Sequence, residues 1–224
     1  MSRTVVSWDV LMPERRAGMC EVKPRALLLI AYEGDDEETL QVPVAVARAM
    51  RSKRTELGEH GMVRSDLLSC VSDVQRECAK ERMVSLLERR DCSKAEVLQR
   101  LSREGYPAFA QEHALEVGTR CGLLNDALFA ERFARSKSMS GWGKRRIEYE
   151  LSRRGVDVHA LAGWPDEFFD VDDEYRRACE VAARKHVREP NARMKLARFL
   201  VGRGFAHDLA FRAAEEALDA KVAS

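Results

Sequence analysis

The spacing of apolar residues changes once along the chain, near Ser65. Before it, short apolar runs at Thr4–Trp8, Ala26–Tyr32 and Thr39–Val42 are separated by turn-forming residues, which is typical of β-strands. After it, apolar residues recur at intervals of three and four, the period of a helix that buries one face. The pattern predicts a small β element followed by a mainly α-helical chain.

The N-terminal part is also expected to hold a helix. Pro43 suits the first turn of a helix, and apolar residues continue from it to Met50. The polar stretch Lys53–Gly61 is predicted to be a loop, and Ser65 is predicted to cap the next helix. The pattern leaves open whether that helix continues as far as Leu87 or breaks on the way.

Three segments of the helical part end alike, with a leucine four residues before a glycine and an apolar residue after it: Leu101–Tyr106, Leu151–Val156 and Leu200–Phe205. The glycines, 50 and 49 residues apart, are Gly105, Gly155 and Gly204. A fixed period of this size is typical of tandem helical arrays, in which function lies on an extended surface. Each glycine is expected to end a helix in the left-handed conformation.

Each repeat is expected to contain three helices, with the Leu–Gly turn at the end of the second. Ser93 with Glu96 forms a capping-box pattern, and Asn125 and Asn191 are further predicted N-caps. The third helix of the second repeat is expected to be short, because Pro165 stops it. The predicted fold class is mainly α, a tandem array of three three-helix repeats with a small N-terminal β element. Its expected parts are a β-containing segment (1–60) and three helical repeats (61–124, 125–168 and 169–224).

Composition indicates a soluble helical protein. Hydrophobic residues make up 45%, charged residues 33% and aromatic residues only 7% of the chain. The longest apolar run, Ala26–Tyr32, is too short to span a bilayer, and no signal peptide is indicated. The six cysteines form no Cys-x-x-Cys pair and are expected to be reduced, mostly buried thiols. We therefore expect a cytoplasmic protein with no membrane partner.

The net charge of +1 hides strong segregation. Arg132–Arg154 holds eight Lys or Arg against two Glu, and Arg184–Arg203 holds seven against one. Between them, Asp166–Glu174 has six acids in nine residues. Basic blocks separated by an acidic one suggest an anionic partner that contacts part of the surface. For any single block, a solvated helix face is the simpler explanation.

Motifs of catalytic and metal sites are missing from the sequence. Gly143-Lys144 lacks the other residues of a phosphate-binding loop, and Gly141-Trp142-Gly143 lacks the third glycine of a dinucleotide-binding loop. No histidine stands at metal-ligand spacing from another ligand. The five isolated histidines are His60, His113, His159, His186 and His207. We expect no enzymatic site, no metal and no cofactor.

Two groups of motifs carry a resemblance to a known family. In the first, Gly122-Leu-Leu-Asn-Asp126 is followed by Arg132-Phe133, by Gly141-Trp142-Gly143, by Arg146-Ile147 and by Glu150-Leu151-Ser-Arg-Arg-Gly155. The second group is Arg198-Phe199-Leu200 followed by Arg203-Gly204-Phe205. In order and spacing they resemble the RecX family, bacterial regulators of the RecA recombinase, over about residues 75–220. The β segment loosely resembles an N-terminal extension of longer members.

The chain departs from the family pattern at three places. Asn125 stands where the family usually has aspartate, and it should still cap a helix. Lys144 stands where many members have proline, which adds a charge at the helix start. The third helix of the second repeat is truncated, with Trp164 and Pro165 at its end.

The resemblance implies a non-enzymatic regulator that binds the RecA–DNA filament. It would modulate, and in the main hypothesis inhibit, RecA recombinase and coprotease activity, and so act in DNA repair, homologous recombination and the SOS response. We expect a monomer. The alternative is a sequence-tolerant DNA-binding helical protein that acts directly on duplex or single-stranded DNA. An enzyme acting on nucleic acid would need a metal-dependent carboxylate site, which the sequence does not reveal.

Seven bases are candidate contacts for a partner or for DNA: Lys144, Arg145, Arg146, Arg153, Arg154, Arg198 and Arg203. The first three fall in the first turn of a helix, where the helix dipole disfavours cations, so an external partner explains them better than helix stability does. The next two fall in its last turn, where the dipole favours them. Arg146 and Arg154 are also predicted to pair with Glu150, so their structural and functional explanations are balanced.

Apolar residues at helical spacing are assigned to the core: Phe129, Phe133, Ile147, Leu151, Phe199 and Leu200. Trp142 has two explanations. It fills the interior of the repeat, which we favour, or it stands out as an anchor for a partner.

Overall fold

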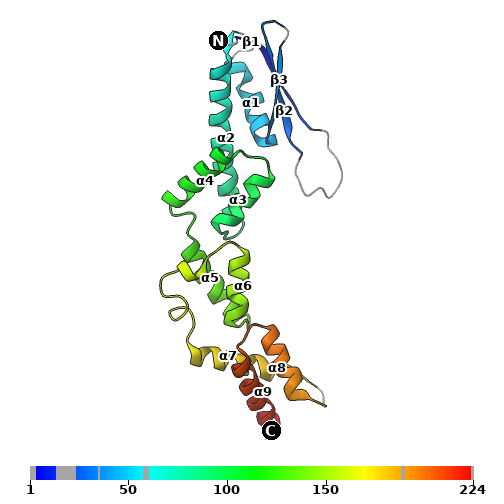
Figure 1. The fold of residues 1–224 in the computed structure, drawn as a ribbon, viewed down its shortest axis with the longest axis vertical. Helices are drawn as coiled ribbons and strands as arrows, with labels where there is room; N and C mark the ends of the chain where they lie inside the picture. Colours follow the sequence, from blue (N-terminus) through cyan, green and yellow to red (C-terminus); the bar gives the residue numbers. More distant parts are fainter. Residues whose placement is uncertain (1–3, 14–23, 35, 58–60, 188–189, 223–224) are drawn as a thin grey trace. The chain divides into compact units, whose positions relative to one another are not determined.

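The computed structural model describes residues 4–13, 24–34, 36–57, 61–187 and 190–222 (Figure 1). The chain divides into two compact units, Met1–Leu124 and Asn125–Ser224. The described residues form nine α-helices, one 3-10 helix and four short strands. The predicted fold class, a mainly α array of helical repeats with a small β element, is confirmed.

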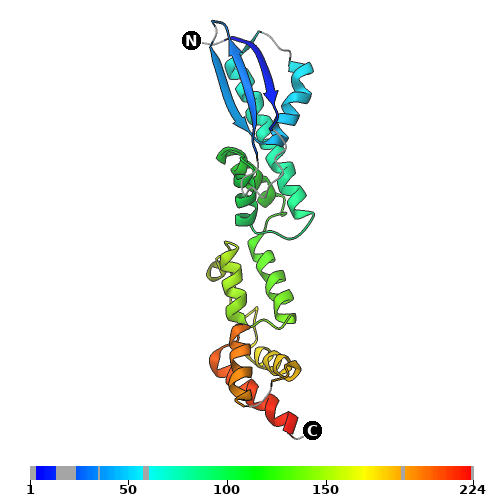
Figure 2. The same ribbon diagram turned by 90° about the vertical axis from the view of Figure 1, so that its right-hand side faces the viewer.

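The β element is an antiparallel sheet in the order β3-β2-β1-β4. Its strands are β1 (Thr4–Leu11), β2 (Ala26–Tyr32), β3 (Glu37–Val42) and β4 (Met62–Val63). Trp8 lies opposite Ile30, and Leu28 opposite Leu40. Trp8, Ile30 and Leu28 are buried in the hydrophobic core of the first unit. Figure 2 shows the sheet with helices on one side only. The strand β4 was not predicted, because two residues carry no periodicity.

Two helices cover the sheet, α1 (Val44–Leu57) and α2 (Arg64–Leu87). The predicted loop from Lys53 was wrong in its first part, because α1 continues to Leu57 and Arg54 on it pairs with Asp9 at 2.8 Å. His60, in the same stretch, lies outside the described residues, as does Cys20. The question left open by the periodicity is answered: α2 is continuous.

The start of α2 differs from the prediction. The helix begins at Arg64, and its N-cap residue Val63 supplies no side-chain hydrogen bond, so Ser65 is not the cap. Arg64 instead donates two hydrogen bonds, of 2.8 and 2.7 Å, to the carboxylate of Glu38 on β3. A tertiary ion pair therefore holds the helix start where a local cap was expected.

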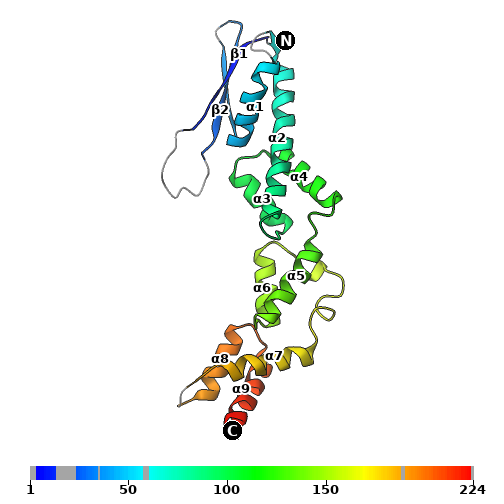
Figure 3. The same ribbon diagram turned by 180° about the vertical axis from the view of Figure 1, so that it is seen from behind.

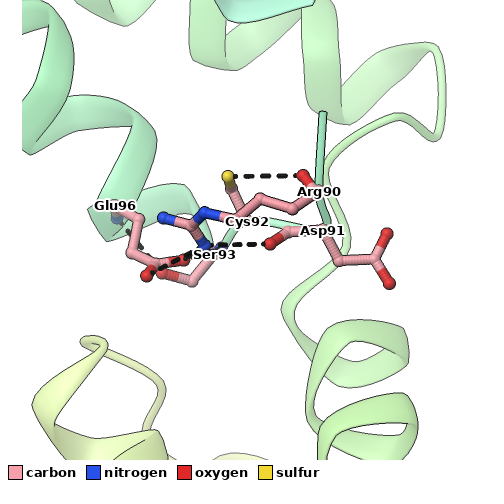
Figure 4. Close-up of polar contacts among 5 residues, drawn as sticks. All are labelled: Arg90, Asp91, Cys92, Ser93 and Glu96. Atoms are coloured by element: carbon pink, nitrogen blue, oxygen red, sulfur yellow. Dashed lines mark hydrogen bonds and ion pairs between the residues drawn. The ribbon is translucent and has the colours of Figure 1, made fainter. Parts of the chain in front are cut away.

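The helices α3 (Lys94–Arg103) and α4 (Ala108–Arg120) complete the first repeat. The predicted capping box is present at the start of α3 (Figure 4). Ser93 Oγ accepts from the amide of Glu96 at 3.1 Å, and the amide of Ser93 donates to Glu96 Oε2 at 3.2 Å. Arg90 Nη1 also contacts this carboxylate, at 3.1 Å from Oε2. The two capping hydrogen bonds of α3 therefore join residues of its own segment.

The three Leu–Gly turns share one backbone geometry. Gly105, Gly155 and Gly204 have φ of 88°, 72° and 92°. In each turn the amide of the following residue donates to the leucine carbonyl, at 3.1, 3.1 and 3.2 Å, and the glycine amide donates to the carbonyl one residue later. This is the Schellman motif. The residue after each glycine is buried, so the turn also returns the chain to the core.

The second repeat contains α5 (Asp126–Met139), α6 (Lys144–Arg153) and the 3-10 helix η1 (Val158–Ala160). The predicted cap at the start of α5 is confirmed, since Asn125 Oδ1 accepts from two amides at 3.0 and 3.1 Å. The third helix is reduced to η1. Trp164 and Phe169 pack into the core instead, with ring centroids 5.3 Å apart, and Trp164 Nε1 donates to Glu148 at 3.3 Å. An aromatic cluster thus replaces the missing helix.

The third repeat contains α7 (Val171–Arg184), α8 (Ala192–Gly202) and α9 (His207–Val222), which pack together (Figure 3). The predicted side-chain cap at Asn191 is wrong. Its backbone is left-handed, with φ of 67°, and its side chain makes no capping hydrogen bond. Asparagine tolerates this conformation better than most residues. The residue therefore shapes the turn into α8 through its backbone.

The cysteines of the described residues differ in their burial. The described cysteines are free; Cys78 and Cys92 are buried, whereas Cys121 is exposed, against the expectation of mostly buried thiols. Burial raises the pKa of the Cys78 thiol to about 11. Within the described residues, none of the helices combines the length and apolar content that crossing a bilayer requires.

Candidate partner-binding surface

The helix α6 has one buried face and one exposed face. Ile147 and Leu151 are fully buried, one helical turn apart. Arg145, Tyr149 and Arg153 follow one another at intervals of four on the opposite side, and all three are exposed. Tyr149 is 62% exposed, and the Arg153 guanidinium lies 5.9 Å from its ring centroid. We call these three residues the α6 row.

The bases of the α6 row differ in their contacts. Arg153 Nη1 lies 3.5 Å from Glu150 Oε1, in an ion pair whose arginine side chain is exposed and whose glutamate side chain is half-buried. The Arg145 side chain makes no hydrogen bond or ion pair with any described residue. Surface ion pairs contribute about 0–1 kcal/mol, so neither guanidinium is held strongly by the fold. Both remain accessible to an external partner.

The N-terminus of α6 is held by the third repeat. The Lys144 amide donates to Glu174 Oε1 of α7 at 2.9 Å, and the Arg145 amide donates to the Gly204 carbonyl at 3.1 Å. Glu174 is only 8% exposed. Its carboxylate offsets both the helix dipole and the three bases of the first turn. The three bases therefore have a second explanation besides an external anionic partner, namely the Glu174 carboxylate of the same chain. The sequence did not reveal it.

Two glycines bring the backbones of the second and third repeats into contact. Gly143 precedes α6, and its amide donates to the Arg203 carbonyl at 2.9 Å. A Cβ on Gly143 would lie 2.3 Å from the carbonyl carbon of Gly204, and a Cβ on Gly204 would lie 2.4 Å from Cβ of Arg146. Only glycine fits at either position. We call Gly143 and Gly204 the glycine joint.

Arg146 and Arg154 turn toward aromatic rings. The Arg146 guanidinium lies 3.9 Å from the Trp142 ring centroid, and that of Arg154 lies 5.1 Å from the Phe133 centroid. Trp142 meets Phe133 edge to face, with centroids 6.4 Å apart, and is packed against the core of the repeat. The interior explanation of Trp142 is therefore correct. Among the described residues Arg146 forms no ion pair with Glu150, because cation–π contact takes its place.

Arg203 lines a groove of about 740 Å³ formed by the end of α5, one side of α7 and the end of α8. Its Nη1 donates to the Ser140 carbonyl at 3.2 Å. Of the charged residues that line the groove, one is acidic, Glu180. The bases that line it are Arg176, Arg177, Arg184, Lys185 and Arg203. We call this the basic groove, and only Arg203 of its bases was among the sequence candidates.

The far side of α7 is attached to α9, which explains why its bases face the groove. The Tyr175 hydroxyl donates to Glu216, and the Arg212 guanidinium lies 4.6 Å from the tyrosine ring centroid. That hydrogen bond, with burial, raises the pKa of Tyr175 to about 12. Arg177 is roughly 200° further around the helix and therefore points away from α9.

The remaining candidates, Lys144 and Arg198, lie on different helices, α6 and α8. Lys144 is half-buried, and its side chain makes no ion pair with a described residue. Arg198 is exposed on α8 and makes no hydrogen bond, ion pair or ring contact with a described residue. No group of three His, Cys, Asp or Glu side chains in the described residues is placed to hold a metal ion.

Comparison with known proteins gives the family. The model of the second three-helix domain of RecX matches residues 125–160, and that of the third three-helix domain matches residues 172–213. The regulatory protein RecX of Chromohalobacter salexigens is 36% identical over 138 residues, which cover 58% of this chain and 87% of the relative. The chain belongs to the RecX family. The regulatory protein RecX of Mycolicibacterium smegmatis is 32% identical over 149 residues, covering 61% of this chain and 78% of the relative.

Solved RecX structures share the fold. A crystal structure of a regulatory protein RecX has a TM-score of 0.56 at 16% identity and covers 92% of this chain and 96% of its own. The crystal structure of RecX from Lactobacillus salivarius has a TM-score of 0.55 at 18% identity and covers 64% of this chain and 96% of its own. The helical array of this RecX family member is therefore shared with distant relatives.

Sequence reasoning missed two parts of this surface. Tyr149 was overlooked, although its spacing of four from Arg145 and from Arg153 places all three on one helix face. Arg177 and Arg184, seven residues apart on α7, were overlooked because Arg184 opens the basic stretch whereas Arg177 lies between that stretch and the acidic one. Helical phase, rather than local charge density, was the signal that could have found both sets.

Proposed function

We propose that this protein binds the RecA–DNA filament and inhibits the recombinase and coprotease activities of RecA, without an enzymatic reaction of its own. It would thereby regulate DNA repair and homologous recombination in the cytoplasm. Membership of the RecX family and the name of the relatives, regulatory proteins, support a role in regulation through a protein partner. The observation that carries the proposal is the exposed α6 row.

The composition of the α6 row is that of an interface hot spot. Tyrosine and arginine are enriched at the energetic centres of protein interfaces. A tyrosine that is 62% exposed contributes little to the fold, so its apolar ring is available for burial by a partner. Arg145 and Arg153 flank it on a rigid helix, which limits the entropy lost on binding.

The other predicted bases extend or support this surface. We assign Arg198, which is exposed, and Lys144, which is half-buried, to peripheral contacts, because neither side chain makes an ion pair with a described residue. Arg146 and Arg154 support the surface from beneath by packing on Trp142 and Phe133. Repeats placed along a filament would contact several protomers, so modest individual contacts would add up to tight binding. The four-part division of the chain, at residues 60, 124 and 168, stays a prediction.

The test is DNA strand exchange and ATP hydrolysis by the cognate recombinase, with this protein added below the recombinase concentration. We expect inhibition of strand exchange at sub-stoichiometric amounts, because one array would block several protomers. A variant with Tyr149→Gln and Arg145→Gln should inhibit far less. No effect of the wild-type protein on either reaction would contradict the proposal.

Direct DNA binding is the second candidate, because α6 is the second helix of a three-helix unit and exposes Arg145 near its start. The carboxylate of Glu174 at the α6 N-terminus opposes it, since it occupies the position where a phosphate would be bound. Binding to bare duplex with a steep salt dependence, unchanged by recombinase, would favour this candidate instead.

A further inference from the structure

We infer that the basic groove binds an acidic, partly apolar peptide segment of a partner protein. The α6 row lies on another element and is not part of the groove. The binding itself follows from the groove's own chemistry, whereas the identification of the partner as a recombinase rests on the proposed function.

Arg177 supplies the main argument. Its Nε and Nη2 are buried and have no hydrogen-bond partner among the described residues. These two nitrogens form the side of the guanidinium that grips an oxyanion with two parallel hydrogen bonds. Buried donors without a partner are rare, because each loses its hydration without compensation. Arg177 therefore has a donor pair that lacks an acceptor.

Two other arginines of this chain show what such a pair binds. Arg64 uses Nε and Nη2 to hold both carboxylate oxygens of Glu38, at 2.8 and 2.7 Å. Arg82 holds Glu104 in the same way, with both distances at 2.8 Å. A carboxylate is therefore the group that matches the geometry of Arg177.

The surroundings of Arg177 attract acids. Arg184 is exposed beside it and makes no hydrogen bond or ion pair with a described residue. Arg203 is fixed by the Ser140 carbonyl, while Arg176 is paired with Asp173 at 2.6 Å. The summed charge of the lining is strongly positive, because Glu180 alone opposes five bases. Such a groove raises the local concentration of acidic segments.

The groove also has an apolar part. Met139, which is 83% exposed, lines it together with Val181 and Phe199. An exposed methionine adapts to partners of different shape. A volume of about 740 Å³ lies within the range that encloses a drug-sized ligand, so a few peptide side chains fit.

A peptide fits this lining better than a nucleic acid does. Single strands are bound mainly by stacking bases on open aromatic faces. The aromatic ring that lines the groove, Phe199, already has Lys185 Nζ at 5.1 Å and the Arg203 guanidinium at 5.2 Å from its centroid. Glu180 can accept a hydrogen bond from a peptide amide, whereas a phosphate backbone offers it no donor.

Binding requires a small rearrangement. Both free nitrogens of Arg177 are covered in the present conformation, so the side chain must rotate to present them to the carboxylate. The rotation is favourable because it relieves two unpaired donors at once. We therefore expect Arg177 to change conformation on binding, whereas Arg203 stays in place.

The experiment is fluorescence anisotropy of the full-length protein with a short labelled peptide in which Asp and Glu alternate with Leu and Phe. The comparison ligands are the same peptide with Asn and Gln in place of the acids, and an oligothymidylate of equal charge. We expect binding of the acidic peptide only. Arg177→Gln and Arg184→Gln should each weaken it about tenfold, because each removes a charge-assisted pair.

Arg120→Gln is the matched control, because it removes an exposed charge from α4 and should leave the affinity unchanged. Thermal unfolding of each variant is recorded; if Arg177→Gln destabilises the fold, the exposed Arg184 carries the test. Equal binding of the peptide by wild type and by Arg184→Gln would overturn the inference. Tighter binding of the oligothymidylate, lost in the same variants, would overturn it in favour of nucleic acid.

The inference and the proposed function can fail separately. If the wild-type protein inhibits the recombinase but does not bind the acidic peptide, the groove inference is wrong and the proposed function stands. If the peptide binds and the groove variants lose it, while the wild-type protein leaves strand exchange unchanged, the groove inference stands and the proposed function is wrong.

Discussion

The helices α3 and α6 are the second helices of two repeats and end in the same Leu–Gly turn, yet their N-termini are completed in opposite ways. Ser93 and Glu96 cap α3 from within its own segment. In α6 the matching position is Gly143, and the cap comes from Glu174 and from the Gly204 carbonyl of the next repeat. The capping box of α3 is local, whereas the cap of α6 comes from the next repeat.

The two helices also differ in how their basic side chains are paired. At the end of α3, Arg100 and Arg82 both contact the Glu104 carboxylate, and the hydrogen bonds that Arg82 itself donates to Glu104 raise the pKa of Arg82. At the positions of the α6 row, α3 has Ala95, Gln99 and Arg103. The shared turn therefore builds the scaffold, while the residues on the exposed face decide whether a repeat offers a contact to a partner.

The largest loss of stability is expected for Gly143→Ser, which gives α6 the N-cap residue of α3. A serine would normally stabilise a helix start, but here its Cβ would lie 2.3 Å from the Gly204 backbone. We expect the second unit to lose about 3 kcal/mol or more of unfolding free energy. Hydrogen exchange, which resolves the two units, is the measurement.

Gly202→Ala is the control for this prediction, because a Cβ there meets nothing within 4 Å and Gly202 lies at the end of α8. It should be neutral or gain a few tenths of a kcal/mol. Similar losses of protection in the two variants would show that the glycine joint is not what makes Gly143→Ser costly.

Glu174→Gln should have the next largest effect. The amide side chain keeps the shape but removes the charge that faces the helix dipole and three bases, so we expect a loss of about 2 kcal/mol. Asp173→Asn, on the same helix, breaks only an exposed ion pair with Arg176 and should cost less than about 1 kcal/mol. Urea denaturation of both variants checks this difference. Equal urea midpoints of unfolding would contradict the capping role of Glu174.

Tyr149→Gln converts the centre of the α6 row into its α3 counterpart. We expect the concentration needed for half-inhibition of strand exchange to rise about tenfold, which corresponds to about 1.4 kcal/mol. The unfolding free energy should hardly change, because the ring is 62% exposed. Gln99→Ala on α3 is the matched variant and should inhibit like wild type. An unchanged inhibitory concentration for Tyr149→Gln would exclude the row from the interface.

The smallest effect is expected from Ser93→Ala. It removes one acceptor of the capping box and should cost the first unit about 1 kcal/mol. Ser102→Ala, exposed on the same helix, should have no measurable cost. Thermal unfolding of the two variants gives the comparison, and a loss confined to the second unit would contradict the local nature of this cap.

Features with a local cause were predictable from the sequence. The capping box of Ser93 and the turns at the three repeat glycines depend on residues a few positions apart, and the structure confirms them. The start of α2 was not predictable, because it depends on an ion pair between Arg64 and Glu38, 26 residues away. Likewise Glu174 lies 30 residues from Lys144, whose amide it caps.

The candidate surface was predictable only in part for the same reason. Arg145 and Arg153 lie on an exposed face, as amphipathic spacing suggests. Arg146 and Arg154 turn inward because Trp142 and Phe133 present their ring faces to them, which is a tertiary contact. Tyr149 could be placed outside only once the buried positions Ile147 and Leu151 fixed the phase of the helix.

The glycine joint has a consequence for how such arrays change over time. A contact between two backbones places no demand on surface side chains, so residues on the exposed faces can diverge freely while the coupling of the repeats is inherited. A serine in place of Gly143, as at Ser93 of the first repeat, excludes this form of coupling. The residue at the start of the second helix therefore decides whether a repeat can make this backbone contact with the next one.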